Sequence, residues 1–195
     1  MTKATALQTI KRYFSSDTSF SISNVSVFSH VYEKTHLSVF RYVYGLTGGR
    51  LQEAEDLTAE VYARAWKARQ HFHGNEPAAL GWLLRIAKNL VIDLARSYKT
   101  HQADEEIDIE SLVDPDELPE LDIIARQQIK TLWCMLRLLT EEPREMLVLR
   151  YILGWQVKQI AEHVGSSENN VSVTIRRALQ RLRNDWPRSQ EKDNG

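Results

Sequence analysis

Apolar residues recur every three or four positions along most of the chain, which is the spacing of helices with one buried face. Between residues 26 and 100 this pattern is interrupted only at Gly48-Gly49 and from Gly74 to Pro77. Glycine and proline are the residues that most often end helices. The pattern therefore predicts three helices in this part of the chain, separated by two short breaks.

The first of these helices is expected from about Val27 to Leu46, and the second from about Leu51 to Arg69. The third is expected to start after Pro77. Its apolar side would consist of Leu80, Leu83, Leu84, Ala87, Leu90, Val91 and Leu94. We interpret residues 26–100 as one three-helix unit.

The same periodicity returns near the C-terminus. Residues 121–139 are predicted to be helical, and a second helix from Thr140 to about Leu153 begins with acidic residues and a proline, as helix starts often do. Two further helices, Gln156 to Val164 and Glu168 to about Trp186, are separated by the short turn Gly165-Ser166-Ser167. The whole chain is therefore predicted to be all-α.

The last two predicted helices fit a helix-turn-helix, which needs a glycine in the turn and a small residue where the helices touch. Gly165 and Ala161 supply these, and Ser167 is a suitable N-cap. The inner face would consist of Ile160, Val164, Val171, Ile175, Leu179 and Leu182. The outer face would carry Glu168, Asn169, Asn170, Ser172, Val173, Arg176 and Arg177, followed by Arg181 and Arg183. Asn and Arg can bind adenine and guanine edges, but a plain hairpin with a solvated charged face remains an alternative.

The charge distribution changes the picture in the middle of the chain. Residues 101–122 contain ten acidic residues, no Lys or Arg, and two prolines. A segment of this composition buries too little apolar area to offset the cost of ordering it, so we expect a flexible acidic linker. Residues 26–100 have ten Lys and Arg against seven Asp and Glu, and residues 123–188 have eleven against six. Two mildly basic units therefore flank an acidic tether.

Other features of the composition exclude several classes of protein. Cys134 is the single cysteine, so an internal disulfide or a cysteine zinc cage is excluded and a reducing cytoplasm is expected. Neither a secretory signal nor a membrane-spanning apolar run is recognisable. Asp56 with Glu60, or His71 with His73, would not make a metal site without further ligands, and no catalytic motif occurs. We expect a protein that is not an enzyme and has no cofactor.

Residues 81–100 combine an apolar side with basic and aromatic residues. Arg85, Lys88, Asn89, Arg96 and Lys99 stand against the single acid Asp93. Nearby aromatic side chains that could stack on unpaired bases are His71, Phe72, His73, Trp82 and Tyr98. Taken alone, this segment is better explained by a core tryptophan and a solvated charged face.

Three segments, taken in their order along the chain, suggest a function for these basic and aromatic residues. DLTAEVYARAWKAR (56–69), GWLLRIAKNLVIDLARS (81–97) and the stretch from Leu139 to Arg183 resemble the polymerase-binding helix, the promoter-melting helix and the promoter-reading domain of extracytoplasmic-function (ECF) sigma factors of bacterial RNA polymerase. The resemblance covers about residues 26–186. It implies two helical domains, at 26–100 and 122–188, joined by the linker 101–121. Residues 1–25 precede the resemblance, and their serine-rich run indicates a flexible extension, although Leu7, Ile10, Tyr13 and Phe14 could form a short docking helix.

The resemblance also implies roles for individual residues in polymerase binding. Asp56, Glu60 and Arg64 would dock on the clamp helices of the largest polymerase subunit, and the C-terminal domain on the flap of the second largest. Ala59 departs from the family, whose members often carry Gln there. An anti-sigma factor, sometimes membrane-bound, is a further expected partner, without membrane insertion of this chain.

Promoter contacts are implied at both ends. The −10 element would be bound and melted by His71, Phe72, His73, Asn75, Trp82, Lys88, Asn89, Asp93 and Arg96, with a base captured by the loop from His71 to Pro77. The −35 element would be read by the helix-turn-helix at 156–177, through Ser167, Glu168, Asn169, Asn170, Ser172, Val173, Arg176 and Arg177. Ser166, Ser172 and Thr174 depart from the family's usual apolar or basic residues, so the promoter sequence cannot be inferred from relatives.

Two alternatives remain open from the sequence. A dimeric helix-turn-helix regulator would use the same C-terminal motif on palindromic DNA without core polymerase. A sigma-like protein that has lost activity could serve as an interaction decoy. Dependence on polymerase distinguishes the first alternative from a sigma factor.

Overall fold

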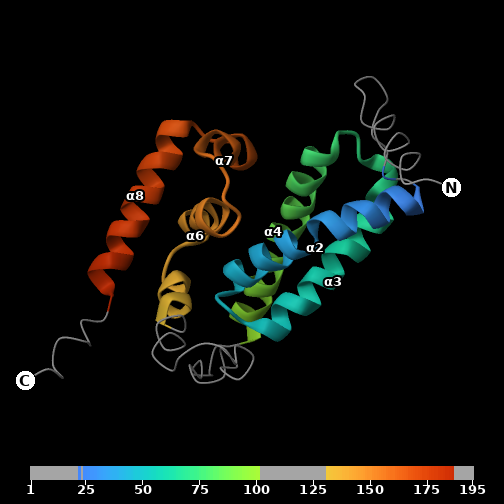
Figure 1. Ribbon diagram of the computed structural model, residues 1–195. Coiled ribbons are helices and arrows are strands. Elements are labelled where there is room, and N and C mark those ends of the chain that lie inside the picture. The colour runs from blue at the N-terminus through green and yellow to red at the C-terminus, as the bar shows by residue number, and fades with distance from the viewer. Residues whose placement is uncertain (1–21, 23, 102–130, 187–195) are drawn as a thin grey trace, which may run out of the picture.

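The computed structural model of the protein describes residues 22, 24–101 and 131–186. Every regular element in these ranges is a helix, which confirms the all-α prediction for the described part of the chain. Figure 1 shows α2, α3 and α4 together as one bundle, with α6, α7 and α8 as a second group beside it. The predicted linker lies almost entirely outside the described residues, as does most of the predicted N-terminal extension.

The first bundle forms as the apolar pattern predicts. It consists of α2 (Val25–Thr47), α3 (Leu51–Ala68), the short 3-10 turn η1 (Arg69–His71) and α4 (Glu76–His101). The Asn24 side chain caps the start of α2 by accepting a hydrogen bond from the amide of Ser26 at 3.0 Å. Gly48 ends α2 in the left-handed conformation, with φ of 73°, which glycine adopts without the steric cost of a side chain.

The second group begins with a helical stretch at 131–137, the described end of the helix predicted from residue 121. It continues with α6 (Glu141–Leu147), a π-helical turn η4 (Val148–Ile152), α7 (Val157–Val164) and α8 (Glu168–Asp185). The helix predicted from Thr140 to Leu153 is thus present, but its last turn is wider than an α-helical turn. The backbone amide of Leu153 bonds the carbonyl of Val148 at 3.1 Å, five residues back.

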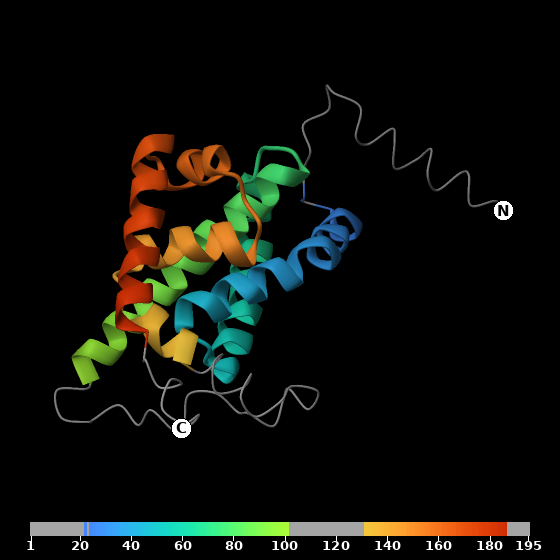
Figure 2. The same cartoon turned by 60° about the vertical axis from the view of Figure 1, so that its left-hand side comes forward.

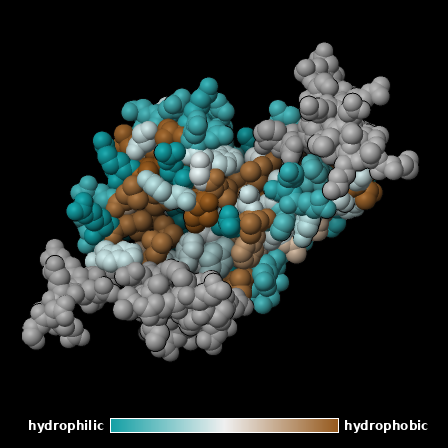
Figure 3. Space-filling model, in the orientation of Figure 1, coloured by the Kyte–Doolittle hydropathy of each residue, from teal (hydrophilic) through white to brown (hydrophobic). Residues whose placement is uncertain are grey.

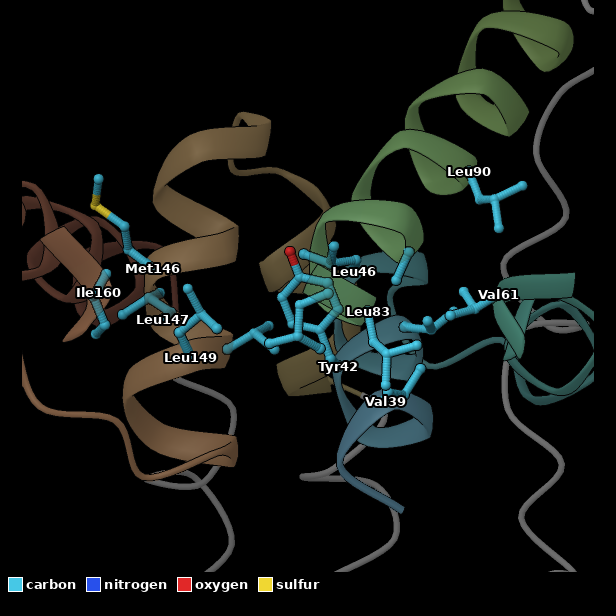
Figure 4. Close-up of a cluster of buried hydrophobic side chains, with 14 of the residues drawn as sticks. Val39, Tyr42, Leu46, Val61, Leu83, Leu90, Met146, Leu147, Leu149 and Ile160 are labelled. Atoms are coloured by element: carbon cyan, nitrogen blue, oxygen red, sulfur yellow. The ribbon is translucent and has the colours of Figure 1, made fainter. Parts of the chain in front are cut away.

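One hydrophobic core runs through both groups. Val39, Tyr42 and Leu46 of α2 lie in the same buried cluster as Leu149 of η4 and Ile160 of α7. Figure 4 shows these side chains as a continuous row that extends through Leu83 to Val61 of α3. Burial of apolar surface is the dominant stabilising term in folding, so the two groups share part of their stability.

The contact between the groups is close. A Cβ added at Gly45 of α2 would lie 2.7 Å from Cγ2 of Val148, so the Val148 side chain fills the space that a methyl group at position 45 would need. Figure 2 shows α6 and η4 beside α2. Arg144 of α6 donates one hydrogen bond across the contact, to the carbonyl of Leu46 at 2.9 Å. Its other guanidinium hydrogen bonds go to the carbonyls of Leu136, Arg137 and Leu139, so one side chain caps two helices.

Three details differ from the sequence predictions. Leu179 was placed on the inner face of the last helix, but its side chain is 39% exposed, and Ala178 is buried instead. The buried stripe of α8 follows Val171, Ile175 and Ala178, and Leu179 lies beside it. Ile22, within the predicted extension, is fully buried in the core, and α2 starts two residues earlier than expected. The predicted domain boundaries themselves stay predictions.

Ile22 should contribute to stability although it lies before the first helix. Ile22→Ala removes a buried side chain and is expected to lower the free energy of unfolding by about 2–5 kcal/mol. Val25→Ala is the matched control, because Val25 is 63% exposed, and a change of less than about 0.5 kcal/mol is expected. Urea denaturation followed by circular dichroism measures both. Equal effects would mean that Ile22 is not part of the folded core.

Candidate nucleic-acid interface

The exposed face of α3 carries the three side chains predicted to bind polymerase. Asp56 and Arg64 are exposed, and Glu60 is half-exposed at 45% of its side chain. Arg64 Nε donates to Glu60 Oε1 at 2.8 Å, and Gln52 donates weakly to Asp56 at 3.4 Å. An exposed pair four residues apart on a helix is worth only a few tenths of a kcal/mol. Glu60 and Arg64 can therefore give up their contact with each other and bind another partner at little cost in free energy.

The loop between α3 and α4 places the predicted base-capturing residues differently. His71 and His73 are exposed. Asn75 accepts a hydrogen bond from the amide of Ala78 at 3.0 Å, so its side chain caps the first turn of α4. Phe72 is buried and its ring packs 5.0 Å from the half-buried ring of Trp82. Phe72 thus supports the loop, and its predicted stacking on an unpaired base would need this ring to leave the core.

The predicted promoter-melting helix α4 presents an exposed polar face and one engaged lysine. Asn89, Asp93 and Arg96 are exposed, with Arg96 and Asp93 loosely paired at 3.8 Å. Lys88 differs from these three. Its Nζ donates to Oε2 of Glu145 in α6 at 2.6 Å, and its side chain is only 36% exposed.

Glu145 is the centre of a polar cluster in the core. Glu145 as a whole residue is only 1% exposed to solvent. Besides Lys88, it accepts a hydrogen bond from the hydroxyl of Tyr42 of α2 at 2.7 Å, and Nε2 of His163 of α7 lies 3.7 Å from Oε1. The carboxylate thus has neighbours on three helices, two of them in the first bundle.

The electrostatics of this cluster favour the charged carboxylate. Burial alone would raise the pKa of Glu145, but contacts from His163, Lys88 and Tyr42 outweigh burial and hold the pKa below its ordinary value. Burial and the adjacent carboxylate raise the pKa of Tyr42 well above its ordinary value. The phenol therefore remains a neutral hydrogen-bond donor to a charged acceptor.

The helix-turn-helix has the predicted local structure. Gly165 ends α7 in the left-handed conformation with φ of 69°, and the Ser167 hydroxyl caps α8 by accepting from the amide of Asn170 at 3.2 Å. These two predictions are confirmed. Gln159 adds a cap to α7, accepting from the amide of Gln156 at 2.8 Å. The angle and the start of the predicted recognition helix are thus fixed by short-range contacts.

The predicted DNA-reading side chains lie mostly on the outer face of α8. Glu168, Asn169, Asn170, Ser172, Arg176 and Arg177 are exposed, whereas Val173 is half-buried. Asn170 donates to Ser166 at 2.8 Å, and Ser172 donates back to the carbonyl of Glu168 at 2.8 Å. Figure 3 shows a hydrophilic edge over α8, with hydrophobic residues on its inner side toward α6. These outer side chains of α8 are therefore accessible to solvent.

The functional arrangement includes residues that the sequence analysis did not select. Glu145, Tyr42 and His163 carry no local signal, because the residues that meet at Glu145 are up to 103 positions apart in sequence. In the described part of the chain, no group of three or more His, Cys, Asp or Glu side chains is arranged to hold a metal ion. None of the described helices combines the length and apolar character needed to cross a membrane.

Comparison with known proteins agrees with this geometry. Residues 31–100 match the family model for sigma-70 region 2, and residues 129–182 match that for sigma-70 region 4. The chain is 26% identical over 160 residues to the ECF RNA polymerase sigma factor SigX of Bacillus subtilis, covering 80% of this chain and 81% of the relative. It is 28% identical over 158 residues to the ECF sigma factor BldN of Streptomyces coelicolor, covering 80% of this chain and 58% of that longer relative.

A solved structure supports the fold. The sigma factor RpoE in complex with the anti-sigma factor NepR from Bartonella quintana aligns with a TM-score of 0.63 over 82% of this chain and 96% of that one, at 20% identity. Together the two family models cover more than half of the chain. The protein therefore belongs to the sigma-70 family of bacterial RNA polymerase sigma factors. Within that family it is an ECF sigma factor, a DNA-binding transcription initiation factor whose partners are core polymerase and promoter DNA.

The buried carboxylate predicts how stability should depend on pH. The pKa of Glu145 in the folded protein lies below the ordinary value of 4.5. Its carboxylate therefore stabilises the folded state above about pH 4.5, and this contribution is lost as the pH falls through the lower, folded-state pKa. Urea denaturation at a series of acidic pH values measures the loss.

The matched variants are Glu145→Gln and Glu162→Gln, the second at an exposed position of α7. Glu145→Gln should be less stable at neutral pH by about 3 kcal/mol, because a buried charged network loses its centre, and should lose less further stability in acid. Glu162→Gln should follow the unaltered protein. If all three proteins had the same acid dependence, Glu145 would not be ionised in the folded state.

Proposed function

We propose that the exposed face of α3 binds the clamp helices of the largest polymerase subunit through Asp56, Glu60 and Arg64. The support is their shared exposure along one side of the helix, where only weak contacts hold them. The side chains can turn to a partner without breaking any strong contact. The C-terminal domain is proposed to contact the flap of the second-largest subunit.

Promoter recognition is assigned to two separate surfaces. The N-terminal part of α8 enters the major groove at the −35 element, where Asn169 and Arg176 contact base edges and Arg177 a phosphate. The main support is the outer face of α8. Of the eight residues predicted to read the −35 element, six follow the Ser167 cap and are exposed. On α4, Lys88, Asn89, Asp93 and Arg96 bind the −10 element, with His71, His73 and Trp82 next to the captured base. Phe72 and Asn75 support the loop and the helix start.

Strand opening in this proposal is a binding process and not a chemical reaction. Each captured base that stacks on an aromatic side chain gains about 1–3 kcal/mol, comparable with the cost of unstacking it. The protein would then need no catalytic activity and no cofactor of its own. It would act in the cytoplasm, where core polymerase and DNA are found.

An anti-sigma factor is proposed as a further partner. The aligned Bartonella quintana sigma factor was solved with such a partner, NepR. A partner of this kind would keep the present protein from polymerase, and would hold it at the membrane if the partner itself were membrane-bound.

The division of labour can be tested by runoff transcription with core polymerase on genomic promoter fragments. Asp56→Ala/Glu60→Ala should weaken core binding by about tenfold or more, equivalent to about 1.4 kcal/mol, and reduce transcript accordingly. Asn169→Ala/Arg176→Ala should retain core affinity and lose transcript, because a bidentate base contact is worth about 1–3 kcal/mol. Core affinity is measured by fluorescence anisotropy.

Glu55→Ala, exposed on another side of α3, and Asn184→Ala, exposed at the far end of α8, are the controls and should behave as the unaltered protein. Tight binding to a palindromic duplex without core binding would contradict the residue assignments. It would favour use of the helix-turn-helix in a dimeric regulator.

The departure from the family at Ala59 suggests a gain of function. Ala59 is exposed directly before Glu60, so Ala59→Gln can add a polar side chain without disturbing the core. We expect core affinity to increase about threefold, since one new exposed hydrogen bond contributes about 0.5–1 kcal/mol. Ala59→Ser, too short to reach a partner, is the control. No gain with Gln would mean that this position does not face polymerase.

A further inference from the structure

We propose that the Glu145 cluster is an intramolecular latch that holds the two helical units together in the free protein and occupies Lys88, so that the −10 surface of α4 is incomplete until the latch opens. The proposal rests on the proposed function in one respect, the assignment of Lys88 to promoter DNA.

The first argument is the position of the carboxylate between the two units. Glu145 belongs to α6, and its shortest contacts cross to the other unit: Tyr42 Oη at 2.7 Å and Lys88 Nζ at 2.6 Å. Within its own unit, Nε2 of His163 lies farther away, at 3.7 Å. A charged-group hydrogen bond of this length is among the stronger ones in proteins. The cluster therefore links the two units more than it stabilises either one.

The second argument is competition for Lys88. The Glu145 carboxylate, 2.6 Å from Nζ, takes one of the three donors of the ammonium and offsets its positive charge, so Lys88 attracts a DNA phosphate less strongly. Phosphate and carboxylate cannot both approach this ammonium closely without strong mutual repulsion. The neighbouring Asn89 and Arg96 are exposed. Lys88 is thus the member of the proposed −10 set that a contact between the two units withholds.

The third argument is that the latch can be reached from solvent. Lys88 and Glu145 line one wall of an open groove between the end of α2, α4 and the start of α6, together with Arg144 and Tyr98. The Lys88 side chain is 36% exposed at its rim. Water can replace the hydrogen bonds at such a site as the units separate, so opening leaves no polar group of the latch without a partner.

A steric variant tests the latch without touching its polar residues. Gly45→Ala adds a methyl group that would lie 2.7 Å from Val148 of the other unit, while alanine favours the helical conformation of α2 itself. Gly81→Ala is the matched control, because its added methyl group would meet His163 at an ordinary 3.9 Å. Glu145→Gln is a second opening variant, which removes the charge and keeps the size.

Two measurements on the full chain decide the outcome. Small-angle X-ray scattering should give a larger radius of gyration for Gly45→Ala and Glu145→Gln than for the unaltered protein and Gly81→Ala. Anisotropy of a fluorescein-labelled, mixed-sequence single-stranded DNA should show about fivefold tighter binding for the two opened variants, since affinity scales with the fraction of binding-competent protein. Gly45→Ala/Lys88→Ala should remain expanded and lose this gain. Circular dichroism checks that each variant keeps its helices.

These measurements distinguish a failure of the latch from a failure of the proposed masking of Lys88. An unchanged radius of gyration in both opening variants would overturn the latch. Expansion without tighter DNA binding, or a gain that persists in Gly45→Ala/Lys88→Ala, would overturn the masking of Lys88. The scattering result does not depend on the −10 assignment, and the runoff assay tests that assignment separately through Lys88→Ala, so a failure of the latch and a failure of the proposed DNA surface give different results.

Discussion

The polar part of the contact between the two helical units centres on a single buried carboxylate, that of Glu145. An ionised side chain in a protein core costs several kcal/mol in lost hydration unless neighbouring groups replace the water. Glu145 meets that requirement with one donor from α2, one from α4 and a histidine from α7. Its neighbour Arg144 bonds the carbonyl of Leu46 across the same contact. Two consecutive residues of α6 thus supply the polar part of the contact, and Gly45 allows the apolar part by leaving room for Val148.

How far the sequence predicts the fold follows from the range of each interaction. Helix ends depend on residues three or four positions apart, so the turn at Gly165 and the cap at Ser167 could be read directly from the chain. Leu179 was misplaced because it lies at the margin of the apolar stripe, where spacing alone does not decide between it and Ala178. Ile22 was missed because the apolar residues of this serine-rich stretch do not follow a helical period.

For the candidate site, the sequence predicts which residues share a helix surface but not which residues of different helices meet. Residues on one helix face, such as Glu60 and Arg64, follow from spacing, and their pairing at 2.8 Å is a local consequence. Lys88 was selected for its charge and its place in a recognisable motif, but its partner lies 57 residues away on another unit. Which cation a buried carboxylate selects depends on how the helices pack, and no short segment contains that information. Phe72 illustrates the same limit, since only packing against Trp82 shows that its ring is covered.

The proposed surfaces differ in how much the contact between the units limits them. The outer face of α8 and the exposed face of α3 lie away from the contact, whereas Lys88 lies within it. A ligand can shift such an equilibrium only through its different affinity for the two states. Polymerase or DNA that bound the closed and open arrangements equally well would leave Lys88 on Glu145. The energy that frees Lys88 must therefore come from contacts that exist only when the units have separated, and these contacts must offset both the ion pair and the apolar core that the units share.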